Sequence, residues 1–351
     1  MSNATAMEID LTIAICAHNA AGRIGATLAA FSGQNASQVK WEILLIDNNS
    51  SDATSRVARE VGESLNLPLR VIFEAAPGLT NARRRAANEA RGRLLSYIDD
   101  DNIVALDWIV RCVEFLDSFP QCGIVGGRVD PIFEDPASRP ADFDQRYAEA
   151  LAVRNLGDQP LRLIPPKHDG PPGAGMTGRT ALFRTILNDV ACRLSGPKGR
   201  RLSRGEDSEI GLVAHRLGWE LWYAPTLRMG HVLPPARLNE VYLNRLIAEG
   251  SESGPWLDYL RGVAPKESRW QYFKLSVFWL FGSFKNAMLA KLRGPGHPLH
   301  AKMRFWAKMF RYRAIAYWDL ATASPFDAFE ASVKEVKTRA GLPEAVEPER
   351  R

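Results

Sequence analysis

The stretch LLSYIDDDN, residues 94–102, joins an apolar run directly to three carboxylates. Its first five residues predict a short buried strand. Asp99, Asp100 and Asp101 repel one another at the end of that strand unless a cation neutralises them. Mg²⁺ and Mn²⁺ take carboxylate oxygens and usually keep substrate phosphates among their ligands. A solvated acidic turn is the alternative, and the position after an apolar strand argues against it.

Three more apolar runs precede this one, each followed by a stretch with helical spacing: residues 11–16 (LTIAIC), 42–46 (EILLI) and 69–73 (LRVIF). Near-continuous apolar strands separated by helices predict a parallel sheet covered on both faces. Ligands of such sheets lie beyond the carboxyl ends of the strands. The polar residues that follow each strand are therefore candidates for a binding site.

The rest of the chain changes character twice. Residues 130–178 are rich in Pro and Gly and predict long loops, after which residues 206–217 predict a helix and residues 219–224 a strand. From residue 236 to 320 the pattern is helical, aromatic and basic. We therefore predict an α/β domain over residues 1–235 and a helical extension over residues 236–351.

Composition narrows the class of protein. The 351 residues are 46% hydrophobic and 24% charged, which is typical of a globular chain. The net charge of +5 favours anionic partners without deciding their kind. Four scattered cysteines predict reduced thiols. Without a signal peptide or a run of about 20 apolar residues, we expect a cytoplasmic protein, either free or peripheral on the cytoplasmic face of the inner membrane.

Two further polar segments follow predicted strands. IDNNSSDAT, residues 46–54, places Asp47 where a carboxylate can accept hydrogen bonds from a nucleobase or ribose. A turn with a helix cap is the simpler alternative. PGLTNARRR, residues 77–85, places Arg83 near a helix start, where it could contact a diphosphate. A solvated basic helix face is the alternative there.

Later segments offer a base and a metal ligand. Asp207, in RGEDSE (residues 204–209), could take a proton from an attacking hydroxyl, although acids at helix starts often only complement the helix dipole. His231 could bind a metal through a neutral imidazole, although a lone histidine is more often structural. GAGMTG, residues 173–178, fits a dinucleotide fingerprint but follows two prolines instead of a strand. It favours close backbone access to a substrate.

In this order the segments resemble glycosyltransferase family 2, over about residues 11–250. ICAHN (residues 15–19) resembles the first-strand motif, and IDNNSSD (46–52) the second-strand motif. GLTNAR (78–83) resembles the Gly-Leu-Ser-x-Ala-Arg segment, the acidic triplet the Asp-x-Asp signature, and Glu206-Asp207 the Glu-Asp pair. The resemblance implies a GT-A (nucleotide-diphospho-sugar transferase) fold, which is a Rossmann-like mixed sheet flanked by helices. Residues 10–130 would form its nucleotide-sugar half and residues 131–235 its acceptor half.

The resemblance also implies an activity with named residues. It implies inverting transfer of a single sugar from a nucleotide-diphosphate sugar to a hydroxyl, with Asp207 as base and Asp101 and His231 holding Mn²⁺ or Mg²⁺. The residues implied to contact the donor are Ala17, Asn19, Asp47, Arg83, Asp99 and Asp100. The Pro and Tyr usual in the first motif are missing near Ala17, and Arg84 stands where relatives often have Asn. No Gln-x-x-Arg-Trp follows Asp207, which argues against a processive synthase.

Several partners and functions stay open at this point. The acceptor would be a saccharide or a lipid-linked sugar, in cell-surface polysaccharide or glycolipid synthesis. The basic, aromatic residues 270–313 could lie in a membrane interface, pack on the catalytic domain, or form a homodimer. No nucleic-acid module is recognised. A nucleotidyltransferase is an alternative, although AAGRIG (residues 20–25) only faintly suggests its basic glycine loop. A catalytically inactive carbohydrate-binding or scaffold protein is another.

Overall fold

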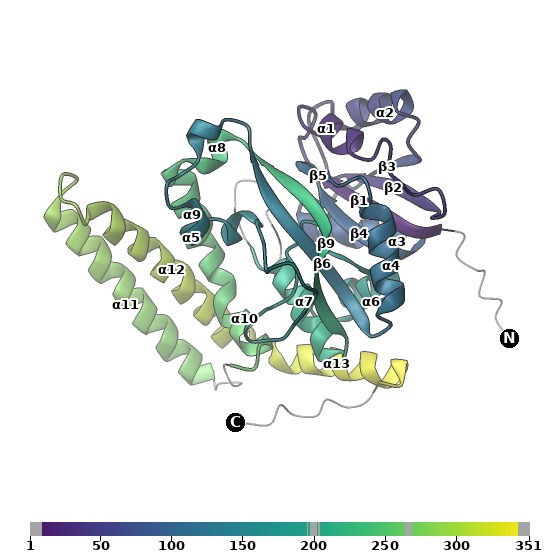
Figure 1. Ribbon diagram of the computed structural model, residues 1–351. Helices are drawn as coiled ribbons and strands as arrows, with labels where there is room; N and C mark the ends of the chain where they lie inside the picture. The colour runs from purple at the N-terminus through teal and green to yellow at the C-terminus, as the bar shows by residue number, and fades with distance from the viewer. Residues whose placement is uncertain (1–8, 195, 197–201, 203, 264–268, 343–351) are drawn as a thin grey trace.

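A nine-stranded mixed sheet forms the centre of the molecule (Figure 1). The structure, a computed structural model, describes residues 9–194, 196, 202, 204–263 and 269–342. The strand order is β3-β2-β1-β4-β8-β6-β9-β5, and β7 pairs with β9. The predicted mixed α/β sheet flanked by helices, with a C-terminal helical region, is confirmed.

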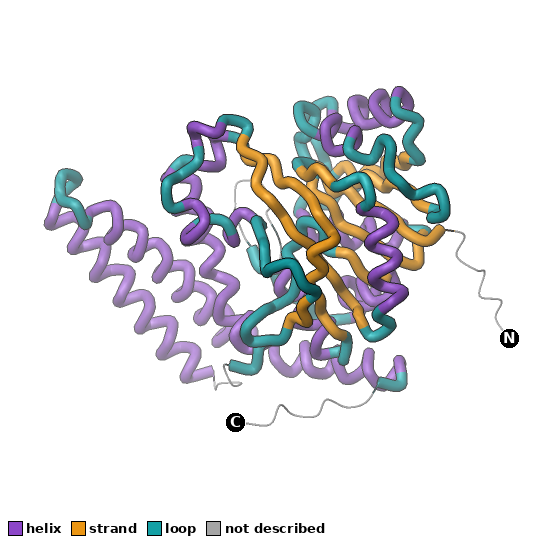
Figure 2. Tube along the Cα trace, viewed as in Figure 1, coloured by secondary structure: helices purple, strands orange, loops and turns teal. Residues whose placement is uncertain are grey.

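The first half of the sheet is parallel, as its sequence pattern predicts. Strands β1 (Ile9–Ala17), β2 (Trp41–Asp47), β3 (Leu69–Phe73) and β4 (Gly92–Asp99) alternate with α1 (Ile24–Ala29), α2 (Thr54–Ser64) and α3 (Leu79–Glu89). The helices cover both faces (Figure 2), so alternate residues of β1 and β2 bury their side chains in two different apolar clusters.

The second half is mixed because β8 enters antiparallel between β4 and β6. Its elements are β5 (Asn102–Val104), α4 (Trp108–Ser118), β6 (Cys122–Phe133), η1 (Pro136–Ser138), α5 (Phe143–Arg146), η2 (Glu149–Leu151), β7 (Leu161–Leu163), β8 (Thr177–Arg179), α6 (Thr180–Asp189), α7 (Glu206–Arg216) and β9 (Glu220–Leu233). The predicted strand over residues 219–224 continues to Leu233, so His231 lies within β9 and not after it.

The C-terminal region is helical, as predicted. It contains α8 (Pro235–Leu238), α9 (Glu240–Gly250), η3 (Ser251–Ser253), α10 (Gly254–Leu260), α11 (Arg269–Arg293), α12 (His300–Ala323) and α13 (Phe326–Ala340). Helices α11 and α12 form a long hairpin that projects from the body (Figure 1). Across the described residues, every helix is too short or too polar to cross a bilayer.

One apolar core joins the C-terminal helices to the sheet. Trp256 of α10, Tyr272 of α11 and Phe329 of α13 belong to the same buried cluster as Tyr97 of β4 and Phe183 of α6. The predicted boundary between the α/β domain and the helical extension, at residue 235, falls between β9 and α9. The helices C-terminal to this boundary share one hydrophobic core with the sheet.

Candidate active site

A cleft of about 360 Å³ opens at the carboxyl ends of the central strands. Residues from β1, α3, α7, β9 and α9 line it. The sequence-predicted site residues among them are Ala17, Arg83, Asp99, Asp100, Asp101, Asp207 and His231. The fold therefore brings together, in one place, segments that are more than 200 residues apart in the chain.

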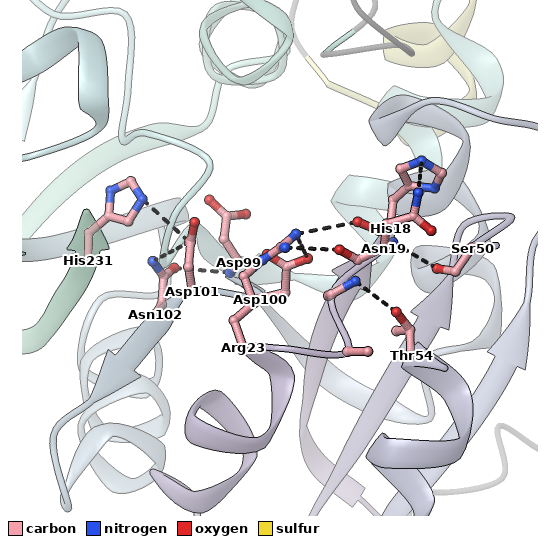
Figure 3. Close-up of polar contacts among 12 residues, drawn as sticks. His18, Asn19, Arg23, Ser50, Thr54, Asp99, Asp100, Asp101, Asn102 and His231 are labelled. Carbon is pink, nitrogen blue, oxygen red and sulfur yellow. Dashed lines mark hydrogen bonds and ion pairs between the residues drawn. The ribbon is translucent and has the colours of Figure 1, made fainter. Parts of the chain in front are cut away.

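Strand pairing explains how the acidic triplet meets His231. Strand β4 ends at Asp99, and β5 begins three residues later at Asn102, which pairs across the antiparallel ladder with His231. The Asn102 side chain also accepts a hydrogen bond from the Asp99 backbone N–H at 3.0 Å, which closes the turn. As a result, Asp101 Oδ1 lies 3.4 Å from His231 Nε2 (Figure 3).

His231 faces Asp101 across the cleft. Its Nδ1 lies 2.8 Å from the Leu151 carbonyl oxygen, so Nδ1 carries the proton that is donated there. Its Nε2 is buried, makes no hydrogen bond with the described residues and lies 3.4 Å from Asp101 Oδ1. Burial lowers the pKa of His231, but Asp101 and Asp99 reverse that effect and raise it, because they favour the protonated ring. When Nε2 is deprotonated, its lone pair faces Asp101, and a metal ion bound by both groups would take the place of that proton.

Two arginines that sequence reasoning missed hold the triplet in place. Arg23 donates to both oxygens of Asp100, at 2.7 and 2.8 Å (Figure 3). Arg237 of α8 donates to Asp101 Oδ2 at 2.7 Å. Arg23 had a weak signal in the faint glycine loop after the first strand, whereas Arg237 belongs to no motif. Only the folded chain shows that Arg237 reaches the cleft.

The three carboxylates differ in electrostatic environment. Burial raises the pKa of Asp100 to about 6, although Arg23 opposes the shift. Burial acts the same way on Asp101, but His231 and Arg237 lower its pKa to about 2. Burial and Asp101 raise the pKa of Asp99, whose carboxylate accepts no hydrogen bond from any described residue. The surroundings thus favour the ionised form most strongly at Asp101, and Asp99 stands beside it with oxygens that accept no hydrogen bond from the described residues.

Neighbouring acids at the start of α7 are also in different surroundings. Glu206 forms a buried ion pair with Arg83, with 3.2 Å between Oε1 and Nη1. Burial and the adjacent Asp207 raise the pKa of Glu206 to about 7, against the opposing effect of Arg83. Asp207 borders the cleft, and its Oδ2 accepts a hydrogen bond from the Gly173 N–H at 3.0 Å. Glu206 therefore has a cationic partner, whereas Asp207 is held by backbone groups.

The loop of residues 173–178 (GAGMTG) approaches these acids closely. A Cβ on Gly173 would lie 2.0 Å from Arg83 Nη2, so a larger residue would displace the buried guanidinium. Gly175 has a φ of +76°, a conformation that favours glycine. The loop of residues 173–178 therefore brings backbone against the site, and Gly173 and Ala174 line the cleft.

Two predicted donor contacts, Asn19 and Asp47, are not among the residues lining the cleft. Asp47 accepts hydrogen bonds from the Ser50 N–H at 3.0 Å and from the Ser55 hydroxyl. Asn19 accepts one from the Ser51 N–H at 2.8 Å. Asn19 thus ties together the loops that follow β1 and β2, and Asp47 holds the turn from β2 into α2. Their neighbours in the sequence, His18 and Asn48, do line the cleft.

The described residues contain no group of three or more His, Cys, Asp or Glu side chains that could hold a metal without other ligands. Asp101 and His231 nevertheless form a pair of candidate ligands, with 3.4 Å between Asp101 Oδ1 and His231 Nε2. Mg²⁺ and related ions are commonly bound by one or two carboxylates together with substrate phosphates. The residues present therefore fit a metal that is completed by a phosphate-bearing ligand.

The mixed sheet with its flanking helices is a GT-A fold. The family model "Glycosyl transferase family 2" matches residues 12–184. Over 150 residues the chain is 25% identical to "Glycosyltransferase AglE" of Haloferax volcanii, covering 42% of this chain and 49% of that protein. The chain thus spans about half the length of this curated relative.

Two solved structures are similar to this chain. GalNAc-T7, solved with UDP, GalNAc and Mn²⁺, is similar over 91% of this chain and 57% of its own, with a TM-score of 0.52 and 16% identity. The mannosyltransferase PcManGT from Pyrobaculum calidifontis, solved with GDP-Man and Mn²⁺, covers 94% of this chain and 79% of its own, with a TM-score of 0.48 and 17% identity. At 16% identity the likeness to GalNAc-T7 concerns the fold alone.

Proposed function

We propose that this chain transfers a single sugar from a nucleotide-diphosphate sugar to a hydroxyl acceptor, with inversion and with the help of a divalent metal. The observation that carries the proposal is the buried Nε2 of His231, which makes no hydrogen bond with the described residues and faces Asp101 at 3.4 Å, in the same cleft as Asp207. A histidine–carboxylate pair suits the metal, and a separate carboxylate suits the proton transfer.

Asp101 and His231 would hold Mn²⁺ or Mg²⁺, which would supply Lewis-acid stabilisation for the charge on the departing nucleoside diphosphate. Asp99 offers further oxygens to the metal or to the donor ribose. Ala17, Asp100 and Arg83 border the cleft on the donor side. The Arg83 guanidinium already pairs with Glu206, so a contact with the diphosphate would have to be shared with that carboxylate.

Asp207 would accept the proton of the attacking hydroxyl. The Gly173 N–H fixes one carboxylate oxygen, and the Ser208 N–H donates to the other at 2.8 Å. These two backbone donors orient the carboxylate at the edge of the cleft. An acceptor hydroxyl activated on this side would attack the anomeric carbon opposite the leaving diphosphate, which inverts the configuration.

The acceptor would be a saccharide or a lipid-linked sugar, in cell-surface polysaccharide or glycolipid synthesis on the cytoplasmic face of the membrane. Apolar residues also line the cleft, among them Leu151, Leu202 and Leu246, which belong to one apolar cluster. They suit an acceptor that carries a hydrophobic portion. Homodimerisation through the C-terminal helices is the other assembly that the sequence suggests.

Thermal unfolding with UDP or GDP, with Mn²⁺, Mg²⁺ or EDTA, tests the proposal. We expect nucleotide to raise the melting temperature only when metal is present, since a ligand at 100 times its Kd adds about 2.7 kcal/mol of stability. Asp101→Asn should abolish this effect, whereas the control Asp130→Asn, at a half-exposed residue paired with Arg128, should keep it. Metal-independent stabilisation would contradict the assigned ligands.

Product analysis separates the alternatives. Screening nucleotide sugars should show release of nucleoside diphosphate. Release of pyrophosphate from a nucleoside triphosphate would instead identify a nucleotidyltransferase. Nucleotide binding without hydrolysis or transfer, across all donors and acceptors, would favour a catalytically inactive binding protein.

A further inference from the structure

The outward face of α11 is apolar where a surface helix is normally polar. Exposed apolar side chains recur along it at steps of three, four or seven residues, which places them on one stripe. They are Trp270, Val277, Phe281, Phe284, Met288 and Leu292, with exposed fractions between 47% and 73%. We call this set the α11 stripe. A stripe of this size, extended over a whole helix, indicates a surface that meets an apolar partner.

The opposite face of α11 is already occupied. Ser276 and Ser283 donate hydrogen bonds to the Ala314 and Ala307 carbonyls of α12, each at 2.8 Å. Gly282 lets the two helices approach, because a Cβ there would lie 2.9 Å from the Phe310 ring. The hairpin is therefore closely packed on its inner side, and turning α11 to bury the stripe would break this packing.

The positive charge of the hairpin favours an anionic bilayer over a second copy of this chain as the partner of the stripe. The hairpin, residues 269–323, holds ten of the chain's 45 Lys and Arg and one of its 40 Asp and Glu, so the remaining residues, 35 basic against 39 acidic, carry a net −4. By helical spacing, Lys274 and Lys285 flank the α11 stripe on one side and Lys291 on the other. Arg304, Lys308 and Arg311 form an exposed basic row on α12.

We propose that the α11–α12 hairpin is a docking surface for an anionic lipid bilayer, with the α11 stripe entering the interface and the flanking basic residues contacting lipid phosphates. Apolar side chains with aromatic rings, bordered by Lys and Arg, are the composition of interfacial helices. A second copy of the hairpin would bring two strongly basic surfaces together, which their mutual repulsion opposes. The acidic body would be repelled from the bilayer, so the hairpin would lead the approach.

The hairpin is coupled to the cleft through one helix. Helix α12 packs against α9, and Ser251, directly after α9, donates to the Met309 carbonyl of α12 at 3.2 Å. Tyr242 and Leu246 of α9 line the cleft. Docking would therefore leave α9 and α12 between the bilayer and the apolar side chains of the cleft. The docking proposal does not depend on sugar transfer, because it rests on the hairpin alone.

Co-sedimentation of the full chain with vesicles tests the proposal. We expect binding to phosphatidylcholine vesicles that contain phosphatidylglycerol, a steep loss of binding as NaCl rises, and much weaker binding to phosphatidylcholine alone. The double variant Phe281→Ser/Phe284→Ser should bind at least about tenfold more weakly, since two exposed aromatic side chains no longer insert. Lys274→Glu/Lys285→Glu should show a comparable loss and a shallower salt dependence.

Matched controls keep the test specific. Phe73→Ser and Arg59→Glu alter exposed apolar and basic residues on the nucleotide side and should leave vesicle binding unchanged. Unchanged melting temperatures would show that all the variants fold. Failure of the wild-type chain to sediment with anionic vesicles at low salt would overturn the proposal. So would self-association that depends on Phe281 and Phe284, or preference for duplex DNA over vesicles.

Discussion

The side chains at positions 206 and 207 are adjacent carboxylates with different tasks. Asp207 is held by backbone N–H groups at the edge of the cleft, and Glu206 faces the buried Arg83. We expect Asp207→Asn to lower turnover by about 10²–10⁴, because the amide cannot accept the acceptor's proton. Metal-dependent nucleotide affinity, measured by calorimetry, should stay within about threefold of wild type. A parallel loss of affinity would place Asp207 in donor binding instead.

Glu206→Gln should instead change how stability depends on pH. Because the pKa of Glu206 is raised to about 7 in the folded chain, the fold favours its protonated form, and that stabilisation is lost as pH rises from about 4.5 through 7. Glutamine stays neutral throughout, so the urea unfolding midpoint of Glu206→Gln should rise relative to that of wild type between about pH 5 and pH 8. If the two midpoints moved in parallel over this range, the raised pKa would be contradicted.

Among single residues, the sequence identifies the acidic side chains of the site better than the arginines that pair with them. Asp99, Asp101 and Asp207 stand in recognisable motifs, and all border the cleft. The roles of Arg23 and Arg237 could not be predicted, because each pairs with an aspartate that is distant in the sequence. Arg23 is 77 positions from Asp100 and Arg237 is 136 positions from Asp101, so only the fold brings them together. The side chains of Asn19 and Asp47 are used in loop hydrogen bonds, and a motif alone does not distinguish that from ligand contact.

Glu42 shows how a single acid connects elements of the sheet. It lies on β2 and accepts hydrogen bonds from Thr12 of β1 at 2.9 Å, Arg70 of β3 at 2.8 Å and the Arg91 N–H at 3.0 Å. Burial raises its pKa, but these donors outweigh burial and lower it below its usual 4.5. Because the folded pKa is depressed, its stabilisation is present above pH 4.5 and is lost as pH falls through the folded value.

We expect Glu42→Gln to lower the free energy of unfolding by about 2 kcal/mol at pH 7, since charged hydrogen bonds are replaced by weaker ones. The difference from wild type should shrink below about pH 4.5, where the wild-type carboxyl also becomes neutral. Glu60→Gln is the control, because that residue forms an exposed pair with Arg56. Urea titrations at several pH values measure both; a difference that is constant with pH would rule out the linkage.

Strand prediction succeeds for the parallel half and stops short in β9. Apolar runs between helices suffice for β1 to β4, because both faces are buried. Pro225 and Gly230 interrupt the apolar pattern of β9, and between Ala224 and Arg228 the strand bulges away from β6. Pairing with β6 resumes beyond the bulge, and this long-range contact carries the strand through His231.

Across the whole molecule, the C-terminal helices and the catalytic sheet share contacts that a sequence pattern does not reveal. Trp256 of α10 donates to Glu209 of α7 at 2.6 Å, and its ring lies 5.3 Å from Phe329 of α13. Aromatic, basic helices could equally have formed a separate unit. Contact with α7 instead places them behind the helix that begins with Glu206 and Asp207.

Phe329→Ala should therefore destabilise the α/β sheet region as well as the C-terminal helices. Phe329 is fully buried, and its loss from a packed core should cost about 3–5 kcal/mol. We expect far-UV circular dichroism, tryptophan fluorescence and loss of nucleotide binding to shift together to a lower temperature. Phe278→Ala, at a side chain that is 66% exposed, should change stability by less than about 0.5 kcal/mol. If Phe329→Ala melted the helices early while nucleotide binding persisted to the wild-type temperature, the shared core would not couple the two parts.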